Sequence, residues 1–245
     1  MLVSIITVCY NSGKTIQKTI ESVLNQTYQE IEYIIVDGLS NDNTMQIVDG
    51  YKEQFATKGM QLKIISEKDH GIYDAMNKGI YNSSGEIIGI INSDDWYEKN
   101  AVEVMMDTYQ KEKFDYFYGD IRLIKTNGQE IIKHSRMDKL VTSRHWNHPT
   151  SFVTKSTYQE LGTFLCEGIH DDFDFFLRVR RAGKKIVIKN QVLADFRMGG
   201  VSNDKSIEKS KKRVKDRYRC YKINGYSRLY LIECILIELV KNIIG

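Results

Sequence analysis

The chain has 245 residues, of which 42% are hydrophobic and 27% are charged, with a formal net charge of +3. This composition, without repeats or low-complexity tracts, excludes a repeat protein and suits one large α/β domain, or a domain with a short appendage. The charge is uneven, because residues 205 to 222 hold nine Lys or Arg against two Asp or Glu. This local +7 leaves 3 − 7 = −4 for the rest of the chain. The four cysteines lack CxxC spacing, which favours a reducing compartment.

The first predicted element is a strand over residues 2 to 9, a nearly continuous, β-branched apolar run. No basic region precedes this run, so we interpret it as a strand rather than a signal peptide and expect a cytoplasmic protein. Apolar residues at helical spacing then predict a helix over about 14 to 26. Strands over 31 to 37 and 62 to 66 follow, separated by a helix over about 43 to 56.

A helix over 72 to 82 precedes a six-residue apolar strand that begins at Glu86 and leads to Asp94 and Asp95. Strands and helices alternate with short loops, which predicts a mostly parallel sheet flanked by helices. Ligands bind such sheets beyond the carboxyl ends of the strands. We therefore expect one crevice lined by residues that follow strand ends, namely Tyr10, Asn11, Asp37, Lys68, Asp69, Asp94 and Asp95.

The adjacent carboxylates of Asp94 and Asp95 are the central feature of this pattern. Neighbouring carboxylates repel each other unless positive charge lies beside them, and oxygen ligands suit Mg²⁺ or Mn²⁺ held together with substrate phosphates. An ordinary polar turn in which Asp95 caps the next helix is the alternative. The convergence of polar strand ends favours a nucleotide diphosphate site, where Tyr10 offers a stacking face and Asp37 a hydrogen-bond acceptor.

Beyond the acid pair the pattern changes. A helix over about 98 to 110 leads to a hairpin of strands 116 to 124 and 130 to 134, with a turn at Asn127 and Gly128. A short apolar strand after Pro149, a helix over about 172 to 182 and a strand over 185 to 188 follow. We expect one domain, 1–204, with a nucleotide-binding half (1–97) and an acceptor half (98–204).

Residues 205–245 form a predicted helical extension, first basic and then apolar. Glu233, Glu238 and Lys241 argue against a membrane-spanning helix but leave a wide apolar face. This face would either lie at a membrane surface, with the basic helix facing anionic lipid, or pack on protein. The oligomeric state is not predictable from this pattern.

Several stretches in order resemble the family 2 glycosyltransferases with a GT-A fold, of the bacterial polysaccharide-biosynthesis type. The resemblance covers about residues 1 to 200. Its strongest stretches are Ser-Ile-Ile-Thr-Val-Cys-Tyr-Asn at 4 to 11, Tyr-Ile-Ile-Val-Asp-Gly-Leu-Ser-Asn-Asp at 33 to 42, Asp-His-Gly-Ile-Tyr-Asp-Ala-Met-Asn-Lys-Gly-Ile at 69 to 80, and Gly-Glu-Ile-Ile-Gly-Ile-Ile-Asn-Ser-Asp-Asp at 85 to 95.

The resemblance implies a set of contacts to a nucleotide-sugar, made by Thr7, Tyr10, Asp37, Asp69 and Asn77. It makes Asp94 and Asp95 the metal-binding signature, with Asp94 as the principal ligand, although Asn92 replaces an Asp that is common in the family. Arg197 would reach the pyrophosphate from a closing loop, residues 196–202.

In the acceptor half the resemblance implies a catalytic base at a helix start, for which we favour Asp172 over Asp171 and Asp174. Helix capping is the alternative role for these acids. His148 and Trp96 are expected on the acceptor side, although Pro149 stands where the family usually has Gln. The implied reaction is an inverting transfer, aided by Mn²⁺ or Mg²⁺, from a nucleotide-sugar donor, with UDP expected, to a saccharide or lipid-linked acceptor.

Three other functions fit the sequence less well. A P-loop would need Gly at the position of Val8, and a nucleotidyltransferase would carry a Gly- and Arg-containing loop after the first strand. A non-catalytic scaffold using the basic tail, bound to membrane or nucleic acid, is the remaining alternative. Basic runs are more often solvated faces, so no nucleic-acid partner is expected.

Overall fold

The structure is a computed structural model that describes residues 1–199 and 206–244, with side chains described up to residue 240. Its first half alternates strands and helices, as the sequence predicts. The strands are β1 (Val3–Cys9), β2 (Ile31–Asp37), β3 (Gln61–Ser66) and β4 (Ile87–Ile90). The helices are α1 (Ile16–Leu24), α2 (Thr44–Asp49), α3 (Lys52–Thr57) and α4 (Ile72–Tyr81).

The second half mixes strand directions. It contains β5 (Trp96–Tyr97), α5 (Ala101–Glu112), the hairpin β6 (Tyr116–Ile124) and β7 (Glu130–Lys133), β8 (Phe152–Thr154), α6 (Lys155–Leu161), α7 (Asp171–Arg181) and β9 (Ile186–Arg197). Two short 3₁₀ helices, Ser143–His145 and His148–Thr150, precede β8. The tail forms α8 (Ile207–Ile223) and α9 (Tyr230–Ile244).

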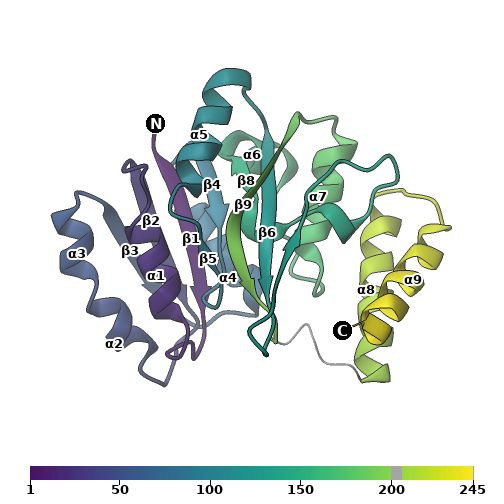
Figure 1. Ribbon diagram of the computed structural model, residues 1–245, viewed down its shortest axis with the longest axis horizontal. Helices are drawn as coiled ribbons and strands as arrows, with labels where there is room; N and C mark the ends of the chain where they lie inside the picture. Colours follow the sequence, from purple (N-terminus) through teal and green to yellow (C-terminus); the bar gives the residue numbers. More distant parts are fainter. Residues whose placement is uncertain (200–205, 245) are drawn as a thin grey trace.

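The described strands form one sheet in the order β3-β2-β1-β4-β8-β6-β9-β5, with β7 paired to β6. The pairings run β1, β2, β3, β4, β6 and β9 in one direction, so the sheet is mostly parallel. The carboxyl ends of these strands therefore reach the same edge. Figure 1 shows α2 and α3 at one end of the molecule and the α8–α9 pair at the other.

Two apolar cores cover the two faces of the sheet because side chains alternate along each strand. In β1, Ile5 and Cys9 pack toward α1, α3 and α5, whereas Ile6 and Val8 pack toward α4 and α7. Cys220, Tyr221 and Cys234 of the tail belong to the second core. The first tail helix and the inner side of the second are therefore packed on the body.

Several predicted boundaries were wrong. The helix expected over 43 to 56 is two helices, because Gly50 and Tyr51 interrupt it. The short strand expected over 185 to 188 is the twelve-residue β9, and neither β5 nor α6 was anticipated. The closing loop expected over 196–202 falls partly outside the described residues, which stop at 199 before resuming at 206.

Candidate active site

The loops that follow β1, β2 and β4 are bonded to one another at the carboxyl edge of the sheet. Asn11, in the left-handed region with φ of 50°, accepts a hydrogen bond from Asn41 N at 2.9 Å and donates through its own N–H to Ser40 Oγ at 2.8 Å. Ser12 Oγ and Ser93 Oγ are 2.8 Å apart. The convergence predicted for these strand ends is thus present, and it brings Asp94 and Asp95 beside the loop after β1.

Asp95 is fully buried at this edge. Its Oδ1 accepts a hydrogen bond from Arg197 N at 3.0 Å, and its main-chain oxygen accepts one from Thr19 Oγ1 at 2.6 Å. Within the described part of the chain its Oδ2 has no hydrogen-bond partner. Burial raises the pKa of Asp95 well above its usual range, and the charge of Asp94 raises it further. A carboxylate in this setting favours a proton or a cation.

Asp94 is only partly exposed, and burial raises its pKa as well, against the opposing effect of the Arg197 charge. The side chain of the neighbouring Asn92 presents a second buried oxygen, Oδ1, that lacks a hydrogen-bond partner among the described residues. Two carboxylates and an amide oxygen thus lie on one short turn with unused acceptor capacity.

Arg197 ends β9 and lies beside this turn. Its guanidinium carbon is 5.5 Å from the centre of the Trp96 ring, and Lys18 Nζ is 3.3 Å from the same ring. Trp96 is nearly buried and pairs with Asp195 of β9. Its described cation contacts are therefore with α1 and with Arg197, and its expected place on the acceptor side stays a prediction.

Tyr10, Gly38 and Asp69 lie together on three neighbouring strand ends. Tyr10 is 62% exposed, which leaves its ring available for stacking. A methyl group added to Gly38 would collide with the Asp69 carboxylate and come within 3.5 Å of the Tyr10 ring. Asp69 Oδ1 accepts a hydrogen bond from Gly71 N at 2.9 Å, and Lys68 beside it is exposed.

The remaining donor-side predictions are buried. Asp37 is fully buried, and its carboxylate accepts hydrogen bonds from Ser40 N at 3.1 Å and Ser66 Oγ at 2.7 Å. Thr7 is also fully buried and accepts a hydrogen bond from Tyr33 OH at 3.0 Å. The structure thus ties Asp37 and Thr7 to protein partners, and their contact with a nucleotide stays a prediction.

Asn77 of α4 is occupied by the segment before α7. Its side-chain NH₂ donates to Phe164 O at 2.8 Å, and its side-chain oxygen accepts from Phe164 N at 2.9 Å. Both ends of the amide therefore fix the backbone of Phe164 on α4. The structure supports a positioning role for Asn77, and a direct nucleotide contact stays a prediction.

Asp172 is the accessible acid of the three at the start of α7. Its side chain is 21% exposed. Its Oδ1 accepts hydrogen bonds from Tyr73 OH at 2.9 Å and Phe173 N at 2.8 Å. No described residue donates a hydrogen bond to Oδ2, which lies 3.9 Å from His148 Nδ1. This oxygen keeps its lone pairs for a proton from a bound hydroxyl group.

Asp171 and Asp174 are fully buried and engaged with the tail. Asp171 accepts hydrogen bonds from Glu167 N at 2.6 Å and Gly168 N at 3.1 Å and pairs with Arg219 of α8. Asp174 accepts from Arg178 Nε at 3.0 Å and from Asn224 Nδ2 at 2.6 Å. These contacts leave neither acid placed as Asp172 is for proton transfer.

His148 lies behind Asp172 in an aromatic setting formed by Trp146 and Phe164. Burial lowers the pKa of His148, although the charge of Asp172 opposes that effect. Its Nε2 is buried without a hydrogen-bond partner among the described residues. Burial therefore favours the neutral imidazole, and the expected place of His148 on the acceptor side stays a prediction.

The donor set fits a divalent cation of the Mg²⁺ or Mn²⁺ type. In residues 1–199 and 206–244, no group of three or more His, Cys, Asp or Glu is placed to hold an ion. Such cations need only one or two protein carboxylates when substrate phosphates supply further oxygens. The buried Oδ2 of Asp95, beside Asp94 and without a partner in the described part of the chain, matches that mode.

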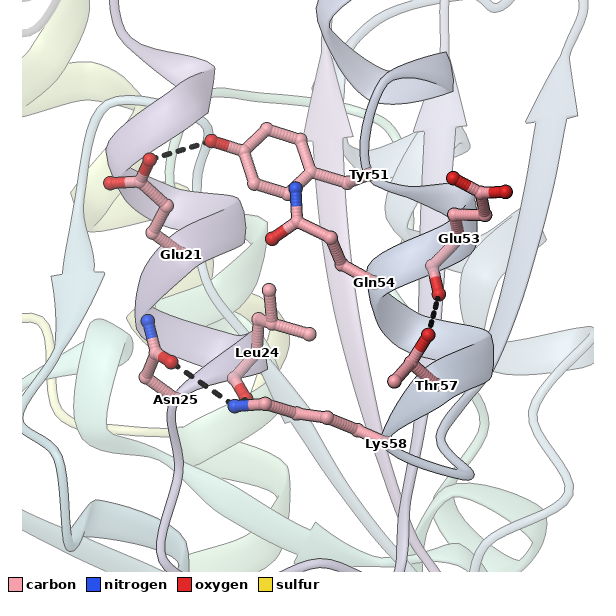
Figure 2. A pocket seen from close by; sticks show the side chains of 8 residues that line it. All are labelled: Glu21, Leu24, Asn25, Tyr51, Glu53, Gln54, Thr57 and Lys58. Atoms are coloured by element: carbon pink, nitrogen blue, oxygen red, sulfur yellow. Dashed lines mark hydrogen bonds between the residues drawn. The ribbon is translucent and has the colours of Figure 1, made fainter.

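A cavity of about 520 Å³ lies away from these residues, between α1 and α3. Figure 2 shows that several of its polar side chains bond to one another or to neighbouring backbone. Tyr51 OH donates to Glu21 at 2.6 Å, and Lys58 Nζ donates to Leu24 O at 2.7 Å and to Asn25 Oδ1 at 3.1 Å. These contacts cap the end of α1, and none of the predicted site residues lines the cavity.

Two contributors to the site were missed. Tyr73, which donates a hydrogen bond to Asp172, lies inside the stretch 69–80 that carries the family resemblance. The resemblance therefore pointed to this segment but did not predict the contact with Asp172. Arg219 lies in the basic run of the tail, which gave no sign of a contact with Asp171. Both pairings join segments far apart in the sequence.

Comparison with known proteins identifies relatives by sequence. The model of a family described as Glycosyl transferase family 2 matches residues 4–181. A chondroitin synthase of Escherichia coli is 31% identical over 195 residues, which cover 74% of this chain and 27% of that protein. An uncharacterized glycosyltransferase of Mycobacterium tuberculosis is 29% identical over 234 residues, 91% of this chain and 86% of that protein.

A Pasteurella multocida chondroitin synthase is 29% identical over 196 residues, 75% of this chain and 19% of that protein. This chain therefore spans only a small part of either chondroitin synthase.

Among solved structures, Staphylococcus aureus TarS 1–349 with UDP-GlcNAc has a TM-score of 0.71 at 18% identity, over 98% of this chain and 72% of that one. The mannosyltransferase PcManGT of Pyrobaculum calidifontis, with GDP-Man and Mn²⁺, has a TM-score of 0.66 at 14% identity, over 97% and 68%. These likenesses show a shared GT-A fold.

Proposed function

Because this chain belongs to glycosyl transferase family 2, we propose that it moves a sugar from a UDP-sugar to a hydroxyl group of a saccharide or lipid-linked acceptor in polysaccharide synthesis. The observation that carries the proposal is the buried Oδ2 of Asp95, which has no hydrogen-bond partner among the described residues and lies beside Asp94 and Arg197. The choice of UDP is supported by the UDP-GlcNAc bound to TarS, and the place in polysaccharide synthesis by the chondroitin synthase relatives.

Asp94 and Asp95 would hold Mn²⁺ or Mg²⁺, with Asp94 as the principal ligand because its side chain is the more accessible of the two. A bound cation supplies charge stabilisation for the leaving diphosphate. Arg197 is exposed beside the pair, so its guanidinium contributes a second positive group for the same phosphates. Tyr10 offers its exposed ring to the base, while Asp37 holds Ser40 in the neighbouring loop.

Asp172 serves as the general base on the acceptor side. As the acceptor oxygen bonds to the anomeric carbon, the bond from that carbon to the diphosphate oxygen breaks and its electron pair leaves with the diphosphate. The acceptor proton passes to Asp172 Oδ2, which has no described hydrogen-bond donor. Tyr73 and Phe173 N hold the other oxygen and so fix the orientation of the carboxylate. This single displacement inverts the anomeric configuration.

The decisive experiment measures diphosphate release with a panel of nucleotide-sugars and saccharide acceptors in Mn²⁺, using the wild type and Asp172→Asn. We expect activity with a UDP-sugar and a loss of about 10²- to 10⁴-fold in Asp172→Asn, the range typical of general base removal. UDP binding by the variant should match that of the wild type, since Asp172 lies on the acceptor side.

Asp107→Asn is the matched control, because Asp107 is an exposed acid on α5, outside the site. It should retain wild-type turnover. Near-normal turnover in Asp172→Asn would overturn the assignment of the base. The absence of transfer from every UDP-sugar, together with transfer from another nucleotide-sugar, would overturn the assignment of the donor.

A further inference from the structure

The second tail helix turns both of its described carboxylates inward. Glu238 is 3% exposed and forms an ion pair with Arg213 of α8. Glu233 accepts hydrogen bonds from Thr142 Oγ1 at 2.6 Å and from Tyr221 OH at 3.3 Å. This arrangement is the reverse of an ordinary surface helix, where acids face water and apolar residues face the core.

The outer side of α9 and the residue before it are apolar. The exposed side chains there, each between 38% and 72% exposed, are Leu229, Leu231, Ile232, Ile235, Leu236, Leu239 and Val240. No charged side chain interrupts them in the described segment from 229 to 240, because Glu233 and Glu238 face inward. A contiguous exposed apolar surface of this kind marks an interaction site more often than a solvated face.

Cations dominate the exposed polar residues of the same helical pair. Lys211, Lys212, Lys215 and Lys222 are exposed on α8, and Arg228 is exposed two residues before α9. Glu208 is the exposed carboxylate in the described segment from 206 to 240. The tail therefore pairs an apolar surface with an excess of positive charge.

We propose that α9 docks on the surface of an anionic phospholipid bilayer, lying in the plane of the interface with its outer side in the headgroup and acyl boundary. Apolar burial of this kind combines with attraction between basic residues and anionic headgroups, worth about 1 kcal/mol per Lys or Arg near the surface. In the described part of the chain, every helix falls short of the length and apolarity needed to cross a bilayer. A helix that lies in the plane of the interface needs neither that length nor that apolarity.

The charge pattern disfavours a second copy as the occupant. A two-fold symmetric contact places the same surface against itself. Such a contact through α9 would supply little opposite charge, because the exposed charges of the described tail are mostly Lys and Arg. A bilayer rich in anionic lipid supplies the complementary charge.

Co-sedimentation of the full chain with vesicles tests this proposal. Phosphatidylglycerol-rich vesicles should bind the wild type, whereas phosphatidylcholine vesicles or raised salt should weaken binding, because salt screens the attraction. Ile232→Glu combined with Leu236→Glu should reduce the vesicle affinity at least tenfold. Both positions are half-exposed or more, so the melting temperature should change little.

Two further variants keep the result interpretable. Ile132→Glu changes a half-exposed apolar residue on β7, outside the tail, and should bind vesicles as the wild type does. Lys211→Glu combined with Lys215→Glu alters charge alone and should weaken binding to anionic vesicles several-fold. The proposal is overturned if the wild type stays in the supernatant with anionic vesicles or if the α9 variant binds normally. A dimer that the α9 variant abolishes, without vesicle binding by the wild type, would assign the surface to a second copy.

Discussion

Asp95 places a carboxylate in a fully buried position next to a second acid, an arrangement that costs stability unless the charge is neutralised. Consecutive acids after an apolar strand were enough to predict the pair from sequence. The sequence did not predict that Asp95 is buried and bonded to Arg197 N, because that contact joins positions 102 residues apart.

The pKa of Asp95 gives a pH-dependent prediction for the metal-free protein. Because the folded-state pKa is raised above the unfolded value near 3.8, the protonated form is favoured in the fold, and stability is lost as pH rises through the folded pKa. Asp95→Asn removes this cost and should stabilise the protein at pH 7 by about 1–3 kcal/mol, with a melting temperature higher by about 2–4 °C per kcal/mol. Thermal unfolding in EDTA between pH 4 and 8 measures the difference.

The increase in stability caused by Asp95→Asn should become smaller toward pH 4, where the wild-type carboxyl group binds a proton. Asp49→Asn, at a half-exposed acid on α2, is the control and should show no such trend. A lower melting temperature for Asp95→Asn at pH 7 would mean that the fold requires the negative charge.

The lowered pKa of His148 predicts the opposite dependence of stability on pH. Burial lowers its folded-state pKa below the usual 6.5, so the stability that its neutral form contributes is present above pH 6.5 and is lost as pH falls through the folded pKa. His148→Gln should therefore lose less stability than the wild type between pH 7 and pH 5. Denaturant unfolding at the two pH values measures this, with the exposed His70→Gln as control. Equal acid sensitivity in His148→Gln and the wild type would contradict the expected effect of burial.

Among elements, α8 braces the start of α7, where the proposed base lies. Asp216 Oδ2 accepts a hydrogen bond from Ile169 N at 2.7 Å, Cys220 Sγ contacts His170 O at 3.3 Å, and Arg219 pairs with Asp171. The described part of the tail thus contacts Asp171 and the two residues before it. Arg219 and Asp216 are positioning residues in this arrangement.

Loss of the ion pair between Arg219 and Asp171 should affect the chemical step more than donor binding. Arg219→Ala leaves the buried carboxylate of Asp171 without its ion pair, which should lower the free energy of unfolding by about 3–5 kcal/mol. In protein that remains folded, kcat should fall while KM for the donor stays near the wild-type value. Lys212→Ala, at an exposed position on the same helix, is the control, and Arg219→Lys should restore part of the activity. A rise in the donor KM alone would contradict the positioning role.

The order of strands and helices up to α4 was predictable because buried parallel strands are continuous apolar runs and amphipathic helices repeat every 3.6 residues. The two-residue β5 and the length of β9 were not predictable. β5 is too short to show a period, and β9 alternates exposed and buried stretches with bulges against β6. α6 follows β8 without an intervening loop, so its start carries no turn residue.

For the whole molecule, the expected family and GT-A fold are confirmed by the family match over residues 4–181 and by the likeness to TarS. Asp94 and Asp95 follow the parallel strand β4, and Asp172 lies at the start of α7. The tail packs its α8 on the body and leaves one side of α9 apolar. The sequence predicted an apolar face but not that both glutamates would point inward, since only the fold places Arg213 and Thr142 opposite them.

We expect Asp94 and Asp95 to bind a divalent cation together with a nucleotide diphosphate. Thermal unfolding with UDP and Mn²⁺ measures this joint binding. The wild type should be stabilised, by about 2.7 kcal/mol at ligand concentrations near 100 times Kd, and EDTA should abolish the effect. Asp94→Asn and Asp95→Asn should remove the Mn²⁺-dependent part, whereas Asp107→Asn should keep it. Equal stabilisation by UDP in EDTA, or full stabilisation of both site variants, would contradict the account.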